Sequence, residues 1–289
     1  MKTIKFIVGF VAICTTLTAT NALATAVQVG GFDATYTADD TWFKSDMRAG
    51  GTAEIVDLTG LGGNLETNQP LPTGVAKLTT GASNSDKAEV SIIRDGGHYG
   101  TIGDFLTGGM LSYDYHKQGA GDLNPSATAA IKFTVLDLNT TQSDGYTTFV
   151  FEPTWNLGTP GTSVVTPTDT WTQGTVTGSA GILWHTGLYG AGNLAGNGSN
   201  GNTLSDWVGV FGDDLLDAFI VGISVGVGTY NQGQTAFFDN VKYLNGAVDL
   251  AYDFQPSVVP LPAALPLYGA GLAVMGLVGL RKRKAKVAA

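Results

Sequence analysis

Tryptophan is the residue type in this chain best suited to hold a ligand. Indole rings pack against the apolar faces of pyranose sugars while the ring N–H stays available for a polar partner. Trp155, Trp171 and Trp184 lie in segments typical of loops, so we predict that one or more of them stacks on a sugar. Trp42 and Trp207 are assigned to the core. The alternative is that all five pack in the interior, where tryptophan in a β-sandwich usually lies.

Catalytic patterns are weak by comparison. Glycoside hydrolysis needs two positioned carboxylates, and among only four glutamates Glu89 and Glu152 form the pair to test. The string Gly222-Ile-Ser-Val-Gly226 matches a serine nucleophile elbow, but it lies within an alternating strand with no helix after it, so Ser224 is predicted to be a solvent-side serine. We predict a protein that is not an enzyme.

Metal chemistry has one candidate. Asp239 shares the strand parity of Phe237, Val241 and Tyr243, which puts a carboxylate on an apolar face. Such a group is costly to bury unless it is paired, hydrogen-bonded or metal-bound. The three histidines are too far apart to form a recognisable metal motif, and the single cysteine, Cys14, lies near the N-terminus. Oxygen ligands, as for calcium, therefore fit this domain best.

The elements that must position these residues are mainly strands. Residues 219–227 alternate strictly and predict a strand with Phe219, Val221, Ile223 and Val225 buried. Further strands are predicted at 90–93, 111–115, 131–136, 146–151 and 235–243. One helix is predicted at 204–211, with Thr203 and Asp206 as a capping box. Short strands separated by Gly, Asn, Asp and Ser indicate an all-β sandwich or barrel.

The domain limits follow from composition. Residues 25–245 contain no Pro-rich linker and no repeat, so we predict one domain there, followed by a stalk at 246–258. The segment 187–202, rich in glycine and asparagine, is predicted to be a long loop. Glycine accounts for 41 of 289 residues but shows no three-residue period, which excludes collagen.

Both ends of the chain read as targeting segments. Residues 1–24 have two lysines, an apolar run and an Ala-Leu-Ala ending, which predicts a secretory signal peptide. Near the other end, an apolar stretch at 265–280 predicts a transmembrane helix, and a basic cluster follows it at once. By the positive-inside rule this cluster is a stop-transfer signal that stays cytoplasmic. Its members are Arg281, Lys282, Arg283 and Lys284.

The last 31 residues, 259–289, resemble the VPLPA variant of the PEP-CTERM sorting signal of exported bacterial proteins. The order Pro-rich box, apolar span and basic cluster is matched in full. The box itself consists of Val259, Pro260, Leu261, Pro262 and Ala263. The resemblance implies recognition by an exosortase-type transpeptidase, with the protein anchored in the inner membrane before processing and then found at the cell surface or in the extracellular matrix. A plain membrane anchor is the alternative.

The middle of the chain is similar to jelly-roll carbohydrate-binding and laminin-type domains. The matching pieces include Gly31-Phe32-Asp33 with Trp42, and Phe238-Asp239-Asn240-Val241. The resemblance implies a jelly-roll β-sandwich with one short covering helix. It also implies a structural Ca²⁺ on Asp239, placed beside Asp33, with capping of first-strand N–H groups by Asp239 as the alternative.

Charge limits the partners. Residues 25–258 carry all 24 acidic residues and only eight basic ones, which excludes nucleic acid and suggests that an anionic polysaccharide would need bridging cations. We therefore expect a non-catalytic exported protein of the cell surface or matrix, with exopolysaccharide as a candidate partner. A secreted polysaccharide hydrolase and a protein-binding adhesin are the alternatives.

Overall fold

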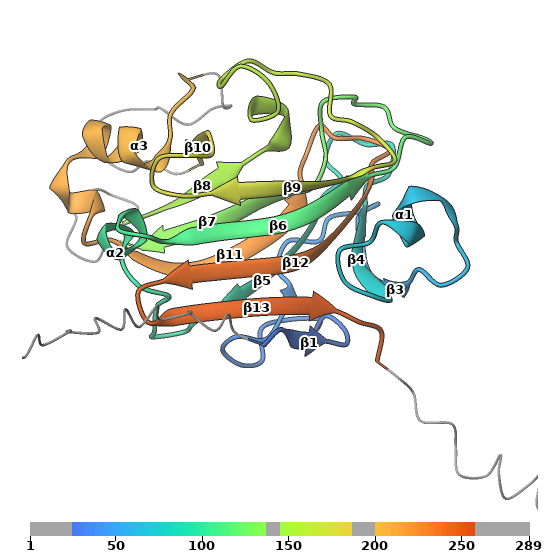
Figure 1. Cartoon of the computed structure of the whole chain (residues 1–289), viewed down its shortest axis with the longest axis horizontal. Helices are drawn as coiled ribbons and strands as arrows, with labels where there is room; N and C mark the ends of the chain where they lie inside the picture. The colour runs from blue at the N-terminus through green and yellow to red at the C-terminus, as the bar shows by residue number, and fades with distance from the viewer. Residues whose placement is uncertain (1–24, 137–144, 187–199, 258–289) are drawn as a thin grey trace, which may run out of the picture.

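Two mainly antiparallel sheets packed face to face make up the described part of the protein (Figure 1). The computed structural model describes residues 25–136, 145–186 and 200–257. The predicted all-β jelly-roll sandwich is confirmed, and all six predicted strands appear within it. They are β5 (Ala88–Ile93), β6 (Met110–Lys117), β7 (Ala130–Leu136), β8 (Tyr146–Phe151), β11 (Phe219–Val227) and β12 (Thr235–Asn245).

Sheet B has six strands in the order β10-β8-β7-β11-β5-β2, and all its pairs are antiparallel. Its edges are β10 (Leu183–His185) and β2 (Phe43–Lys44). Alternate residues of the central strands enter the core, including Ile131, Phe133 and Val135 of β7. Their neighbours therefore project from the opposite, outer face of the sheet.

Sheet A has seven strands built around the long strand β12 (Thr235–Asn245). On one side β12 pairs with β6, which pairs with β9 (Trp171–Val176). On the other side the first half of β12 pairs with β4 (Gly74–Thr79), which pairs with β3 (Thr52–Asp57). The second half pairs with β13 (Val248–Phe254), which is parallel to β1 (Val27–Val29).

Short helices close the sandwich. The predicted helix is α3 (Leu204–Phe211), and the capping box of Thr203 and Asp206 is present at its start. Two further helices, α1 (Gly63–Thr67) and α2 (Ile102–Leu106), and the 3₁₀ turns η1 (Pro153–Trp155) and η3 (Asp213–Leu215) were not predicted. Among the described residues, no helix has the length and apolar character needed to cross a membrane.

The main core lies between the sheets and contains the two tryptophans assigned to it. Trp42 is 2% exposed and Trp207 is fully buried. The Trp207 indole N–H donates to the Leu183 carbonyl at 2.8 Å, which ties α3 to the edge of sheet B. A smaller second cluster of Leu58, Val75 and Phe237 lies outside this core.

Irregularities in two strands correct the predicted burial. In β11 the pairing shifts between Ile220 and Gly222, so Ile220 is buried, whereas Phe219 and Val221, both predicted to be buried, are only half-buried. In β12 the shift falls between Asp239 and Lys242, where Asn240 has a φ of 52°. Alternation is interrupted wherever a bulge inserts a residue. The sequence pattern does not reveal where that happens.

The predicted domain boundary at 245 is also wrong. The expected stalk at 246–258 contains β13, which pairs along β12 and buries Tyr252 and Phe254. The sandwich therefore extends to Phe254. The signal peptide, the sorting motif Val259–Ala263 with its basic cluster, and most of the predicted 187–202 loop lie outside the described residues and remain predictions.

Candidate functional site

A groove crosses the outer face of sheet B. Glu89 of β5 pairs with Gly226 of β11, which pairs with Ala130 of β7, and continuing the register places Glu152 after β8 in the same row. Gly226 and Ala130 are small, so the row has two carboxylates at its ends and a low floor between them. The next row carries Lys132, opposite Val150.

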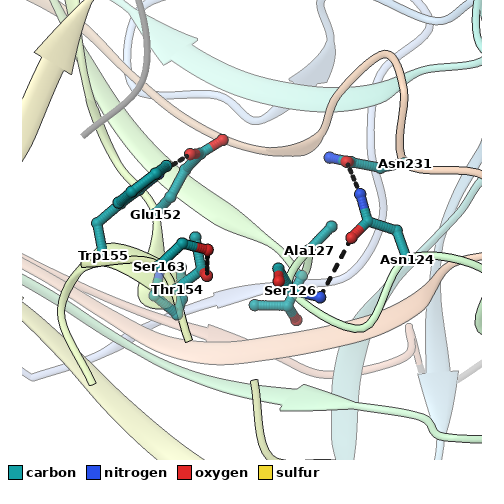
Figure 2. A pocket seen from close by; sticks show the side chains of 10 residues that line it. Asn124, Ser126, Ala127, Glu152, Thr154, Trp155, Ser163 and Asn231 are labelled. Atoms are coloured by element: carbon teal, nitrogen blue, oxygen red, sulfur yellow. Dashed lines mark hydrogen bonds between the residues drawn. The ribbon is translucent and has the colours of Figure 1, made fainter. Parts of the chain in front are cut away.

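Two adjoining hollows of about 270 and 140 Å³ make up this groove, because both are lined by Thr128, Glu152 and Asn231. We call their combined lining the sheet-B groove. The larger hollow runs over the strands, and the smaller one lies where the β8 end meets the loops 118–129 and 228–234 (Figure 2). The residues of the sheet-B groove are Arg48, Lys87, Asn124, Ser126, Ala127, Thr128, Ala130, Lys132, Val150, Glu152, Pro153, Thr154, Trp155, Ser163, Trp184, Thr186, Gly226, Gly228, Thr229 and Asn231.

Two of the three predicted ligand tryptophans border the groove. Trp155 lies in η1, and its indole N–H donates to Glu152 Oε2 at 2.8 Å, as Figure 2 shows. Trp184 lies in β10 opposite Val150 and lines the larger hollow. The Trp184 Nε1 is buried without a hydrogen-bond acceptor among the described residues, although it lies close enough to Glu152 to favour the charged carboxylate slightly.

Glu152 has an unusual environment. Burial raises the pKa of its carboxyl, and the Trp155 hydrogen bond and the charge of Lys132 only partly oppose that shift. A buried carboxyl with a raised pKa keeps its proton at a higher pH than an exposed one and can then donate a hydrogen bond. Glu152 is therefore able to present either a donor or an acceptor to a ligand.

The pKa of Glu89 is shifted in the opposite direction. Burial would raise its pKa, but the charges of Lys132 and Lys87 outweigh burial and lower it. Lys87 Nζ lies 3.0 Å from Glu89 Oε2, and Lys132 Nζ donates to the same oxygen. Glu89 therefore stays ionised and holds two ammonium groups on the groove.

The cation network continues toward solvent through Asp46. Lys87 Nζ lies 2.8 Å from Asp46 Oδ2, and Arg48 binds the same carboxylate through Nε and Nη2 at 3.1 and 3.0 Å. The guanidinium of Arg48, together with Lys87, lowers the pKa of Asp46 to about 2, against partial burial. Arg48 remains half exposed at the mouth of the larger hollow.

One wall of the smaller hollow is formed by two asparagines. Asn124 Nδ2 donates to Asn231 Oδ1 at 3.1 Å and to the Tyr230 carbonyl at 3.2 Å. The buried Lys117 holds this wall from below, because its Nζ donates to the Asn124 carbonyl and pairs with Asp122, both at 2.8 Å. The amide groups of Asn124 and Asn231, which face Glu152 in Figure 2, are thus held in position by the buried Lys117–Asp122 ion pair.

Trp171, the third predicted ligand tryptophan, lies on the other sheet. It begins β9 in sheet A, lies with its ring centroid 5.4 Å from that of His116 in a tilted arrangement, and packs against the second cluster. Its indole N–H donates to the Leu65 carbonyl at 3.0 Å, so the turn around α1 covers it. Trp171 does not join Trp155 and Trp184.

The two predicted metal ligands, Asp239 and Asp33, accept hydrogen bonds from different partners. Asp239 is fully buried, and its Oδ1 accepts from the Phe254 N–H at 3.0 Å, which is a cap on the last strand rather than the first. Asp33 accepts a hydrogen bond from Thr37 instead. No cluster of three His, Cys, Asp or Glu residues suited to a metal is found in the described part of the chain. One feature does fit a cation: Asp239 Oδ2 is buried with no hydrogen-bond partner there.

The serine and histidine candidates also find their places. Ser224 is on the outer face of β11 as predicted, but it is only 7% exposed, because its neighbours include Ser91 and Lys132 in the adjacent strands. It lies within a strand and not at a turn into a helix. His116 is buried in sheet A, whereas His185 packs on Trp207 beneath sheet B.

Several groove residues were missed from the sequence. Lys132 could have been found, because the alternation of Ile131, Phe133 and Val135 already places it on the outer face. Asn124, Asn231 and Arg48 come from loops that are far apart in the chain. Loop residues carry no periodicity, so no sequence signal brought them together.

No family model and no curated protein matches the chain. Among solved structures it is similar to a family 11 carbohydrate-binding module from Clostridium thermocellum in complex with a β-1,3-1,4-mixed-linked tetrasaccharide, with 11% identity, 75% of this chain and 95% of that chain covered, and a TM-score of 0.37. It is also similar to a family 61 module in complex with β-1,4-galactotriose, with 10% identity, 72% of this chain and 91% of that chain covered, and a TM-score of 0.33. An exo-β-agarase is similar with 16% identity, 74% of this chain and 24% of that chain covered, and a TM-score of 0.38. At these scores the likeness assigns no ligand to this chain.

Proposed function

We propose that this chain is a saccharide-binding protein and that the sheet-B groove is its binding site. The observation that carries the proposal is the pair Trp155 and Trp184 beside a groove with a floor of Gly226 and Ala130. Ligand pockets combine aromatic surface with a few placed polar groups. Here both indoles border the same carboxyl group, that of Glu152.

The polar groups of the groove match the needs of sugar hydroxyls. A hydroxyl both donates and accepts, so it is best met by side chains that do the same. Asn124 and Asn231 offer amides, and Glu152 offers a carboxyl whose pKa is raised by burial. Trp184 is only half-buried, so part of its ring remains available for a sugar to stack on.

Binding without catalysis is the function that the geometry favours. Glu89 and Glu152 do flank one groove with pKa values moved in opposite directions, which is the arrangement glycoside hydrolases use. Three strand spacings, roughly 14 Å between backbones, separate them, and Glu89 is held by two lysines. Incubation with oligosaccharides and measurement of new reducing ends tests hydrolysis, and any turnover abolished by Glu152→Gln would replace binding with catalysis.

A glycan array probed with the full chain in detergent tests the binding proposal. Gly228 lines the groove and has open space where a side chain would project, so Gly228→Phe should block the groove without disturbing the fold. Gly209 of α3 also has open space and lies outside the groove lining, so Gly209→Phe is the matched control. Loss of glycan binding in both variants, or in neither, would contradict the assignment. Capture of a protein instead of a glycan would support an adhesin.

The export route of the protein is part of the proposal. The sequence features of residues 1–24 and 259–289 support secretion, membrane anchoring and recognition by an exosortase-type enzyme, followed by a place at the cell surface or in the matrix with exopolysaccharide as partner. Deletion of 281–284 should impair anchoring or processing, because it removes the stop-transfer charges. Normal sorting of the deletion variant would contradict this.

Calcium is proposed for the other sheet, at Asp239. The support is the buried Oδ2 without a partner, since such a group is costly unless an ion or a donor meets it. Melting the protein with calcium and then with excess chelator tests the site. Occupancy at about 100 times the dissociation constant adds roughly 2.7 kcal/mol to the free energy of unfolding. An unchanged melting temperature would leave Asp239 as a backbone cap only.

A further inference from the structure

The few cations of this acidic protein gather at the groove. Residues 25–258 contain 24 acidic side chains and eight basic ones. Three of those eight, Arg48, Lys87 and Lys132, line the larger hollow of the sheet-B groove. Among the described residues, three carboxylates interact with these cations, those of Asp46, Glu89 and Glu152. The groove therefore has balanced charge within a domain where acids outnumber bases three to one.

These cations are held in place before any ligand arrives. The side chains of Lys132 and Lys87 are 12% and 16% exposed, and Glu89 fixes both ammonium groups. An ammonium has three N–H donors. In the described part of the chain Lys132 donates to Glu89 alone, and Arg48 reaches Asp46 through Nε and Nη2 but not through Nη1. Donors therefore remain on both cations for a further acceptor.

The local charge depends on Glu152. Asp46 and Glu89 stay ionised, since their pKa values are lowered by the cations beside them. Glu152 is the exception, because burial raises its pKa. When Glu152 holds a proton, three positive groups face two negative ones. The groove then carries an excess positive charge that a carboxylate ligand would neutralise.

We propose that the groove binds an acidic saccharide, a chain of hexuronate units, with one sugar carboxylate against Lys132 and Arg48 and its ring against Trp184. This inference rests on the proposed saccharide binding and names the class of sugar. Bidentate and charge-assisted hydrogen bonds suit a carboxylate better than a hydroxyl. It also reverses the expectation that an anionic polysaccharide would need bridging cations, because the cations here belong to the protein.

The test compares trigalacturonate with its methyl ester, which keeps the rings and removes the charges. We expect the acid to bind the full chain at least 10-fold more tightly than the ester by calorimetry, with the preference shrinking as salt is raised. Arg48→Gln should weaken binding of the acid about 5-fold and reduce the preference for acid over ester by a similar factor. Arg48 is half exposed, so this variant should fold normally. Lys132→Gln, checked for folding by its melting temperature, should act in the same direction.

The control is Lys77→Gln, which removes the same charge from the Lys77–Glu54 ion pair on sheet A and should alter neither affinity. Equal binding of acid and ester would overturn the inference but keep the proposed function. If only a neutral gluco-oligosaccharide binds, and Gly228→Phe abolishes that binding, the inference is again overturned and the proposed function kept. Absence of binding to all three saccharides would overturn both.

Discussion

The outer faces of the two sheets make a useful comparison, because each carries a tryptophan on a strand beside polar side chains. On sheet A, Trp171 lies against His116 and Phe237, and the chain folds back over it so that its N–H meets the Leu65 carbonyl. On sheet B, Trp184 lies beside Lys132 and Glu152 along an open groove. Within the described residues, the chain covers the first face and leaves the second open.

The difference shows that a tryptophan on an outer sheet face is not by itself a ligand platform. What distinguishes Trp184 is the low floor of Gly226 and Ala130 next to it and its indole N–H without an acceptor among the described residues. On sheet A the corresponding space is filled by Leu58 and Val75 in the second cluster. The predictions below test this contrast.

Replacing Lys117 should have the largest effect. Lys117→Met leaves Asp122 as a nearly buried charge without its ion-pair partner and should lower the free energy of unfolding by about 3–5 kcal/mol. Because Lys117 also holds the Asn124 carbonyl, any saccharide affinity should fall too. Denaturant titration and calorimetry measure the two effects. A stability loss below about 1 kcal/mol would show that the groove wall does not depend on this ion pair.

The two tryptophans should respond in opposite ways. Trp171→Ala should cost about 2–3 kcal/mol of stability, less than a fully buried tryptophan, and leave saccharide binding unchanged. Trp184→Ala should cost about 2 kcal/mol of binding free energy, roughly 30-fold in affinity, with a smaller loss of stability. Thermal unfolding and binding titration of both variants separate the roles. Equal losses of affinity would remove the contrast between the faces.

The buried carboxyl of sheet A should make stability depend on pH. Burial raises the pKa of Asp239 to about 8, so the folded state holds its proton more tightly than the unfolded state. The stabilising contribution is complete below about pH 4 and is lost as pH rises through 8, at about 1.4 kcal/mol per pH unit in between. Asp239→Asn should flatten that slope in melting experiments. Calcium bound to the ionised carboxylate should flatten it as well.

The smallest effect is expected for an exposed ion pair on sheet A. Lys77→Gln separates Lys77 from Glu54, whose Nζ–Oε1 distance is 3.0 Å, and should change stability by about 0.2–1 kcal/mol, decreasing with salt. Urea titration at low and high ionic strength measures it. A loss of stability as large as that in Lys117→Met would mean that the difference in burial does not explain how much each lysine contributes to stability.

The sequence alone determined the elements whose signal is local. Alternation predicted β6 and β7, because a strand buried on one face repeats every two residues. The capping box predicted where α3 begins, because Thr203 and Asp206 satisfy backbone groups only three residues apart. The same alternation predicted the outer-face position of Ser224.

Only the tertiary structure decided which outer-face residues meet and which are covered. The bulges in β11 and β12 explain why Ile220 and Phe238 are buried, since one extra residue makes the parity before it opposite to the parity after it. Trp184, Lys132 and Glu89 come together because β10, β7 and β5 belong to one sheet, although about 40 residues or more separate them in the chain. Strand order depends on long-range pairing, and no local pattern encodes it.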